Sequence, residues 1–181
     1  MAKGLVYVID DAHGEYATLK SYLASRGYEL FTAVGARDVN VNYDIDLKNI
    51  SDINELIKNY DMYILIGGYK MFYFVTNKKP PTKKTELAID TSQLAELTKG
   101  FTKAGAVVIA PLATPAYLAS QGLLSGLKAT VYPVTELIKI LKENNVIYYN
   151  EPIIRDKNII TIKDVKKITE KELAETLREG T

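Results

Sequence analysis

The chain has 181 residues and a formal net charge of +1; 47% of its residues are hydrophobic and 25% are charged. This composition is typical of a globular domain with a sizeable core. Because the net charge is small, the chain has no strong electrostatic attraction to nucleic acid or to an anionic membrane. Cysteine is absent and histidine occurs once. This excludes disulfides, thiolate catalysis and cysteine-ligated metals, and it argues against a histidine-based metal site.

Targeting and membrane segments are not expected from the sequence. No apolar run approaches the roughly 18 residues that a membrane-spanning helix requires. The first residues, Met1–Gly4, lead directly into an apolar run and lack the hydrophobic core of a signal peptide. We therefore expect a cytoplasmic protein. Rich usage of tyrosine, isoleucine and lysine, without cysteine or tryptophan, suits a thermophilic protein.

The chain opens with a strand–helix–strand pattern. Gly4–Asp10 and Tyr28–Val34 are apolar runs that predict strands. Apolar residues at helical spacing in Glu15–Arg26 predict a helix between them, which ends at Gly27. These elements form a βαβ unit, whose crossover is expected to be right-handed.

The next segment predicts an edge strand, a helix and a second buried strand. Val39–Asp44 alternates apolar and polar residues, as an edge strand with one wet face does. Ser51 can cap a helix over Asp52–Asn59. Asp61–Ile66 is a buried strand by its apolar content, and Gly67–Gly68 follows at its end, where glycine permits a ligand or backbone to approach closely.

An aromatic run and a basic loop occupy the middle of the chain. Tyr69–Thr76 is dense in aromatic residues, and Asn77–Lys84 is predicted to be an exposed basic loop because Pro80–Pro81 interrupts regular structure. Lysines beside aromatic side chains are one pattern of nucleic-acid binding, but the small net charge favours a subunit contact. Any residue of Asp90–Ser92 can cap the helix predicted over Gln93–Lys103.

The central stretch predicts a strand, a very tight turn and a short helix. Ala106–Ala110 is an uncharged, β-branched run typical of a strand buried on both faces. Thr114 is a good N-cap, and Pro115–Gln121 is then predicted to be a helix that ends at Gly122 in the left-handed conformation. Leu112–Ala113 must form the turn. In α/β sheets, ligands bind at such carboxyl ends of strands.

The last third continues the alternation of strands and helices. The predicted elements are the strand Lys128–Tyr132, the helix Val134–Glu143, the strand Val146–Asn150, a hairpin of Pro152–Arg155 and Asn158–Lys163, and the helix Thr169–Arg178. We expect an α/β fold: a three-layer sandwich with a flavodoxin-like, mostly parallel sheet and helices on both faces. Residues 1–181 are expected to form a single domain.

The central stretch resembles the nucleophile elbow of the ThiJ/PfpI family, in the class I glutamine amidotransferase-like superfamily. The family pattern is an apolar strand, Cys-(His/Ala)-Gly-Pro, a small-residue helix and Gly-hydrophobic-Leu-x-Gly-x-Lys-x-Thr. Gly122–Thr130 has this last segment, and Pro115 fits the proline of the motif. Counting back from the first glycine places Leu112 at the family's nucleophilic cysteine, Ala113 at its common histidine and Thr114 at its glycine.

The resemblance also implies the residues of a binding site. Family members have a glutamate that opens the first helix and leans against the nucleophile, and Glu15 has this position; its alternative role is to complement the helix dipole. A glycine pair lines the family's pocket. The ligand-binding residues implied are Glu15, Gly67, Gly68, Leu112, Ala113 and Thr114, with no cofactor and no metal.

Four other candidates for chemistry have simpler interpretations. His13 lies in a polar loop, where we expect it to face solvent, and it does not match the family's histidine. Asp10 and Asp11 end a strand and could hold Mg²⁺, but the phospho-acceptor aspartate of a receiver domain is missing. The hydroxyl of Thr114 is expected to cap the helix and not to act as a nucleophile.

Three hypotheses for the function follow. Leucine cannot attack a substrate, so the first is a non-catalytic member, a pseudoenzyme, that binds a small molecule or a partner protein at the former elbow pocket. The second is a cysteine-independent hydrolase, amidase or glyoxalase-like enzyme that uses Glu15, with His13 assisting. The third is a structural oligomer subunit, since the resemblance implies dimers or hexamers, with Tyr69–Val75 as a contact surface. No nucleic acid or membrane partner is expected.

Overall fold

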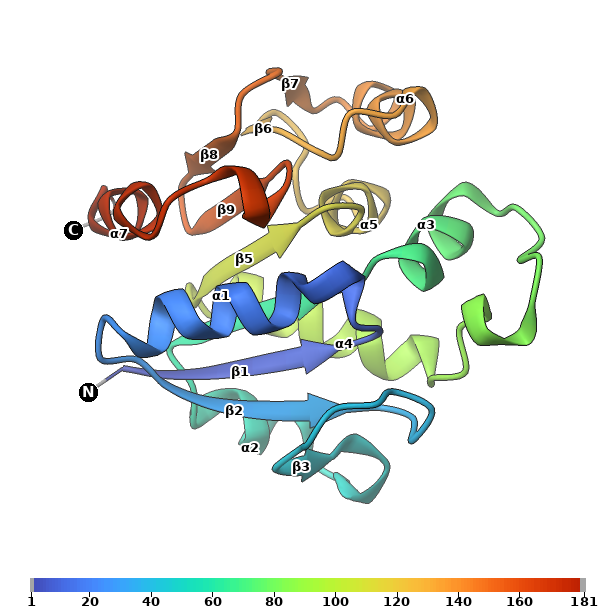
Figure 1. Cartoon of the computed structure of the whole chain (residues 1–181), viewed down its shortest axis with the longest axis vertical. Coiled ribbons are helices and arrows are strands. Elements are labelled where there is room, and N and C mark those ends of the chain that lie inside the picture. Colours follow the sequence, from blue (N-terminus) through green and yellow to red (C-terminus); the bar gives the residue numbers. More distant parts are fainter. Residues whose placement is uncertain (1, 180–181) are drawn as a thin grey trace.

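A seven-stranded sheet forms the middle layer of the computed structural model, which describes residues 2–179 apart from the side chain of His13 (Figure 1). The strand order is β3-β2-β1-β4-β5-β9-β8. All neighbouring strands are parallel except β8 and β9, which form an antiparallel hairpin. The strands are β1 (Lys3–Val8), β2 (Glu29–Val34), β3 (Ile45–Asp46), β4 (Met62–Ile66), β5 (Val107–Pro111), β8 (Ile153–Asp156) and β9 (Ile159–Ile162).

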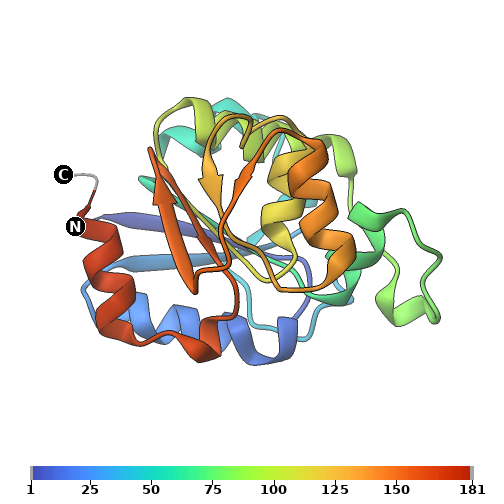
Figure 2. The same ribbon diagram turned by 90° about the horizontal axis from the view of Figure 1, so that it is seen from above.

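Helices cover both faces of this sheet, which confirms the predicted three-layer α/β sandwich. Helices α1 and α7 pack on one face, and α2, α4, α5 and α6 pack on the other (Figure 2). The helices are α1 (Glu15–Ala24), α2 (Ile53–Lys58), α3 (Tyr69–Thr76), α4 (Thr91–Lys103), α5 (Thr114–Ser120), α6 (Thr135–Glu143) and α7 (Glu170–Arg178). None of the helices described in the structure is long and apolar enough to cross a membrane.

The three central strands β1, β4 and β5 are the apolar runs of the sequence. Every residue of β4 is buried, as are all but the first residues of β1 and β5. Strands covered on both faces need apolar side chains pointing both ways, which explains their continuous hydrophobic runs. The parallel register pairs Val8 with Ile66 and Ile64 with Ile109. The carboxyl ends of these strands therefore lie at the same edge of the sheet.

The predicted edge strand Val39–Asp44 is wrong. Only the two residues of β3 pair with β2, and the preceding segment is irregular. Asp44 makes two bonds to Thr32: its amide donates to the Thr32 carbonyl (2.8 Å) and its carboxylate accepts from the Thr32 amide (2.8 Å). The two valines of the segment pack against the core on the α1 face. Their alternation with polar residues thus comes from a loop folded onto the core.

A second, two-stranded parallel sheet lies beside the β8–β9 hairpin without joining the main ladder, and the Lys128 amide donates to the Asp156 carboxylate (2.8 Å). It pairs β6 (Lys128–Ala129) with β7 (Ile147–Tyr148). The longer strands predicted over Lys128–Tyr132 and Val146–Asn150 are therefore wrong in extent. Beyond Ala129 the chain leaves the small sheet and crosses to the elbow, where the Tyr132 amide donates to the Leu112 carbonyl (3.0 Å).

Helix ends agree with the predicted caps in one case and differ in another. Asp90, one of three candidates, caps α4 by accepting from the amides of Ser92 and Gln93. The predicted Ser51 cap of α2 is wrong, since the Asp52 carboxylate accepts from the Glu55 amide (3.1 Å). Either residue type can cap a helix, so composition alone could not decide between adjacent candidates.

Candidate functional site

The chain makes the predicted tight turn between β5 and α5 at Leu112 and Ala113. β5 ends at Pro111, and Leu112 then has a φ of 56°, in the left-handed region. This conformation costs a residue with a Cβ roughly 1–2 kcal/mol. Two backbone bonds hold it: the Leu112 amide donates to the Ile162 carbonyl, and the Leu112 carbonyl accepts from the Tyr132 amide, each at 3.0 Å. Strain fixed by its surroundings in this way is a common mark of functional sites.

Thr114 is placed differently from the prediction. Ala113 occupies the N-cap position, and Thr114 is the first residue of α5. The Thr114 hydroxyl is completely buried and donates to the Pro111 carbonyl at 2.6 Å. The helix starts one residue early because the turn is so tight, and the hydroxyl satisfies the last carbonyl of β5 in place of an amide of α5. Thr114 is not part of the lining of the cavity described next.

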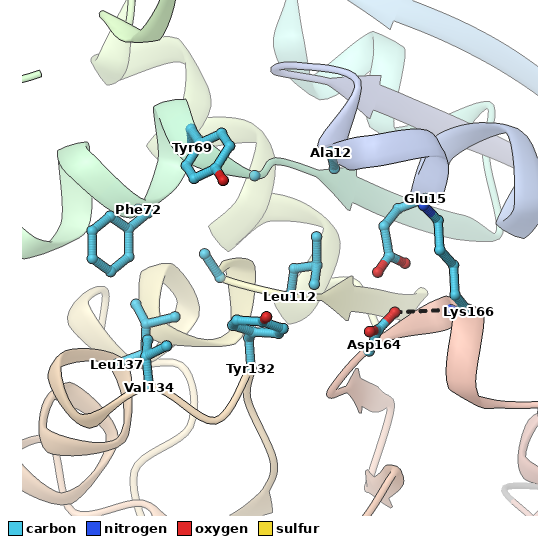
Figure 3. A pocket seen from close by; sticks show the side chains of 12 residues that line it. Ala12, Glu15, Tyr69, Phe72, Leu112, Tyr132, Val134, Leu137, Asp164 and Lys166 are labelled. Carbon is cyan, nitrogen blue, oxygen red and sulfur yellow. Dashed lines mark hydrogen bonds between the residues drawn. The ribbon is translucent and has the colours of Figure 1, made fainter. Parts of the chain in front are cut away.

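A cavity of about 390 Å³ opens beside the elbow, between α3, the start of α6 and the loop after β9 (Figure 3). Its wall consists of the apolar side chains of Phe72, Leu112, Val134 and Leu137 and of two tyrosines, Tyr69 and Tyr132. Leu112 projects into the middle of this space in Figure 3. The volume lies within the range of small-molecule sites.

Glu15 faces the same cavity from the start of α1 (Figure 3). Its side chain is only 1% exposed, and both carboxyl oxygens accept from the Val165 amide, at 3.1 and 2.9 Å. Burial raises the pKa of Glu15 from 4.5 to about 8, with further contributions from the hydrogen bond and negative charge of Asp164, whereas the Val165 amide and Lys166 act to lower it. At pH 7, Glu15 therefore carries a proton.

Two further polar residues line the cavity beside Glu15, and sequence reasoning missed both. Lys166 lies in the short 3₁₀ turn η4 (Val165–Lys167), and Asp164 immediately precedes it. The Asp164 carboxylate caps this turn by accepting from the Lys166 amide (3.0 Å). The loop meets Glu15 from 150 positions along the chain. No local pattern marks these residues, because only the packing of β9 beside β5 brings them to the elbow.

The glycine pair after β4 is divided between two roles. Gly68 lines the cavity, and its amide donates to the Asp10 carboxylate at 2.6 Å, so that N–H group is directed away from a ligand. Gly67 is not part of the lining. A Cβ at Gly67 would lie 2.9 Å from the Cβ of Met71, closer than side-chain atoms pack. Close packing against Met71 explains the glycine at position 67, which remains a candidate only through the family resemblance, whereas Gly68 lines the cavity.

Asp10 has a structural role at this edge of the sheet. Its Oδ1 accepts from the amides of Ala12 and Gly68, and its Oδ2 accepts from the amide of Lys70. It thus joins the end of β1 to the start of α3. Asp11 is exposed. Among the described residues, no three His, Cys, Asp or Glu side chains are grouped as a metal site requires.

His13 lies in the 3₁₀ turn η1 (Ala12–Gly14), but its side chain is outside the part of the chain that the structure describes. The chemical groups that the described residues present to the cavity are therefore a protonated carboxyl, a second carboxyl group, an ammonium group, the phenol groups of two tyrosines and apolar side chains. Such a site can bind, orient and donate a proton. None of the described lining residues provides a thiol or an aliphatic hydroxyl.

A mostly parallel sheet in a three-layer sandwich, with a strained turn between its central strand and a helix, defines the class of α/β proteins with an elbow site. The profile of the DJ-1/PfpI family matches residues 5–176, and the chain belongs to this family.

Individual proteins are similar to this chain in sequence or in fold. A Methanocaldococcus jannaschii protein, MJ0967, is 34% identical over 116 residues, which are 64% of this chain; the chain spans about half, 49%, of that protein's length. Among solved structures, Schizosaccharomyces pombe DJ-1 superimposes with a TM-score of 0.72 (16% identity; 98% of this chain and 92% of that one). Drosophila melanogaster DJ-1beta gives 0.70 (21% identity; 100% and 92%). At these identities the structures share the fold.

Proposed function

We propose that this chain is a non-catalytic member of the DJ-1/PfpI family that binds a small molecule or a partner protein at the elbow cavity. The observation that carries the proposal is Leu112 in the left-handed conformation, with its side chain in the cavity that Glu15 also faces. By the count along the motif that the chain resembles, this is the position of the family's cysteine. An alkyl side chain offers no electron pair for attack on a carbonyl.

Two features support binding at the site. The cavity is open and of ligand size, although an apolar side chain occupies the elbow. The turn also retains a conformation that leucine adopts only at a cost. A turn with no role beyond connecting β5 and α5 would gain stability from glycine at this position.

A second candidate function is a cysteine-independent hydrolase, amidase or glyoxalase-like enzyme. The observation in its favour is Glu15, whose pKa near 8 in a cavity suits a general acid at neutral pH. A third is a mainly structural subunit of a dimer or hexamer. Tyr69 and Phe74 on α3, which are 54% and 38% exposed, support a contact surface there. In each case we propose a single cytoplasmic domain over residues 1–181.

Turnover measurements distinguish these functions. Purified protein is incubated with methylglyoxal and with a fluorogenic peptide, alongside Glu15→Gln and the matched control Glu96→Gln, an exposed glutamate of α4. The proposal predicts no turnover that Glu15→Gln removes. Turnover that is lost in Glu15→Gln and retained in Glu96→Gln would establish the enzymatic alternative. Sedimentation velocity tests the third function, which a monomer would contradict.

A further inference from the structure

The elbow cavity has two chemically different ends. Phe72 of α3 and Leu137 of α6 lie at one end, together with Val134 (Figure 3). Glu15, Asp164 and Lys166 converge at the opposite end, and Leu112 lies between the two groups. A ligand that fills the cavity must therefore place an apolar part beside the aromatic end and a polar part beside the carboxyl groups.

The polar end combines hydrogen-bond donors and acceptors without an excess of charge. Glu15 is mostly protonated at pH 7, and its carboxyl group is hydrogen-bonded to Asp164 and to the Val165 amide. The Asp164 carboxylate accepts hydrogen bonds, and the Lys166 ammonium donates them. Lys166 Nζ lies close to η1, 3.7 Å from where a Cβ of Gly14 would stand. One negative and one positive group thus flank a protonated acid.

We infer that the cavity binds an uncharged small molecule with an apolar, ring-sized body and a primary carboxamide head. This inference rests on the proposed function, and it specifies the ligand of the same cavity. The body lies against Phe72 and Leu137 and passes Leu112. The amide NH₂ donates to Asp164, and its carbonyl oxygen accepts from the Lys166 ammonium group.

Charged heads fit this site less well. A cationic head is attracted by the Asp164 carboxylate but repelled by the Lys166 ammonium. An anionic head is attracted by Lys166 but repelled by Asp164. Either head also loses its hydration on entry, which is costly for a charge that is not fully paired. A carboxamide leaves fewer polar atoms without a hydrogen-bond partner, because the site offers an acceptor for its NH₂ group and a donor for its carbonyl oxygen. Because Leu112 has no nucleophilic atom, an amide bound at the elbow is not attacked by this side chain.

Three probes that share a benzene ring test the inference. Benzamide, benzylamine and benzoate are titrated at pH 6.5 into the ¹⁵N-labelled full chain, and the amide signals of Leu112, Ala113 and Lys166 are followed by NMR. We expect saturable shifts with benzamide and a Kd at least about tenfold lower than with either charged probe. Phe72→Ala should weaken benzamide binding by at least about fivefold, whereas Phe74→Ala, on the same helix but outside the lining, should not.

The outcomes separate this inference from the proposed function. Tighter binding of benzylamine or of benzoate at the same amides would overturn the uncharged head and leave the binding function intact. Saturable benzamide binding that Phe74→Ala and Phe72→Ala weaken equally would overturn the placement of the body. Failure of all three probes overturns the inference, whereas only turnover dependent on Glu15 overturns the non-catalytic function.

Discussion

The proton on Glu15 makes a measurable prediction about stability. Glu15→Gln replaces the carboxyl by an amide of similar shape, which can still accept from the Val165 amide. The amide does not titrate. Any dependence of stability on pH that is due to Glu15 must therefore disappear in this variant.

The sign follows from the raised pKa. Between pH 4.5, the ordinary value, and about 8, the folded protein holds a proton on Glu15 that the unfolded chain has lost. The stabilisation is complete below pH 4.5 and is lost as the pH rises through 8. One pH unit in this window corresponds to about 1.4 kcal/mol. The whole pKa shift corresponds to an upper limit of roughly 5 kcal/mol in the free energy of unfolding. Between pH 5 and 8 we expect the free energy of unfolding of the wild type to fall by at least about 2 kcal/mol more than that of Glu15→Gln.

Urea denaturation followed by circular dichroism at pH 5, 6, 7 and 8 measures this difference. Glu96→Gln removes an exposed carboxylate from α4 and is the matched control; its curve should run parallel to that of the wild type. If the stabilities of wild type and Glu15→Gln change in parallel with pH, Glu15 does not hold its proton in the folded state, and the reasoning on the site's charge fails.

Three other predictions concern the elbow and the edge of the sheet. Leu112→Gly and Leu112→Ala both remove the isobutyl group, but only glycine adopts a φ of 56° freely. The glycine variant should therefore be about 1 kcal/mol more stable in urea denaturation. Equal stabilities would show an unstrained turn. The thiol introduced by Leu112→Cys would face the same cavity as the protonated Glu15, and a nearby proton donor favours the thiolate. Iodoacetamide should therefore alkylate it faster at pH 7 than the thiol introduced by Ser120→Cys at the exposed end of α5. Equal or slower alkylation would argue against an effect of Glu15 on position 112. Asp10→Ala leaves three amides without their acceptor and should lower the free energy of unfolding by about 2–4 kcal/mol in the urea assay. Asp11→Ala, at the exposed neighbouring position, should lower it little. Similar losses in the two variants would refute the capping role of Asp10.

The elbow could be predicted from the sequence because its causes are local. A β-branched run requires burial on both faces, and proline is favoured in the first turn of a helix, which predicted the start of α5 to within one residue. Gly122 has a φ of 76° after α5, as its predicted left-handed role requires. These features left only Leu112 and Ala113 for the turn, and the positive φ of Leu112 agrees.

Helix α3 could not be assigned because its start is determined elsewhere in the chain. Gly68, at its N-cap, has no side chain to cap the helix. The Asp10 carboxylate supplies the missing acceptor from 58 to 60 positions away. The aromatic content of Tyr69–Thr76 is compatible with strand or helix, so local pattern alone could not decide.

The polar end of the cavity was missed for a similar reason. Glu15 was found only because its position matches a family pattern. Asp164 and Lys166 lie in a charged segment that is ordinary for an exposed turn. Only the pairing of β9 with β5, through contacts such as Ala110 with Thr161, places that turn against α1.

The most direct test of the central claim follows the methyl groups of Leu112 by NMR as Glu15 titrates. In the protein labelled at leucine methyl groups, with signals assigned through Leu112→Ala, the Leu112 shifts are recorded from pH 5 to pH 10 in wild type and in Glu15→Gln. We predict an inflection near pH 8 in the wild type and none in the variant. Leu112 shifts that stay flat in the wild type, or an inflection that persists in Glu15→Gln, would contradict an elbow that holds an apolar side chain against a protonated acid.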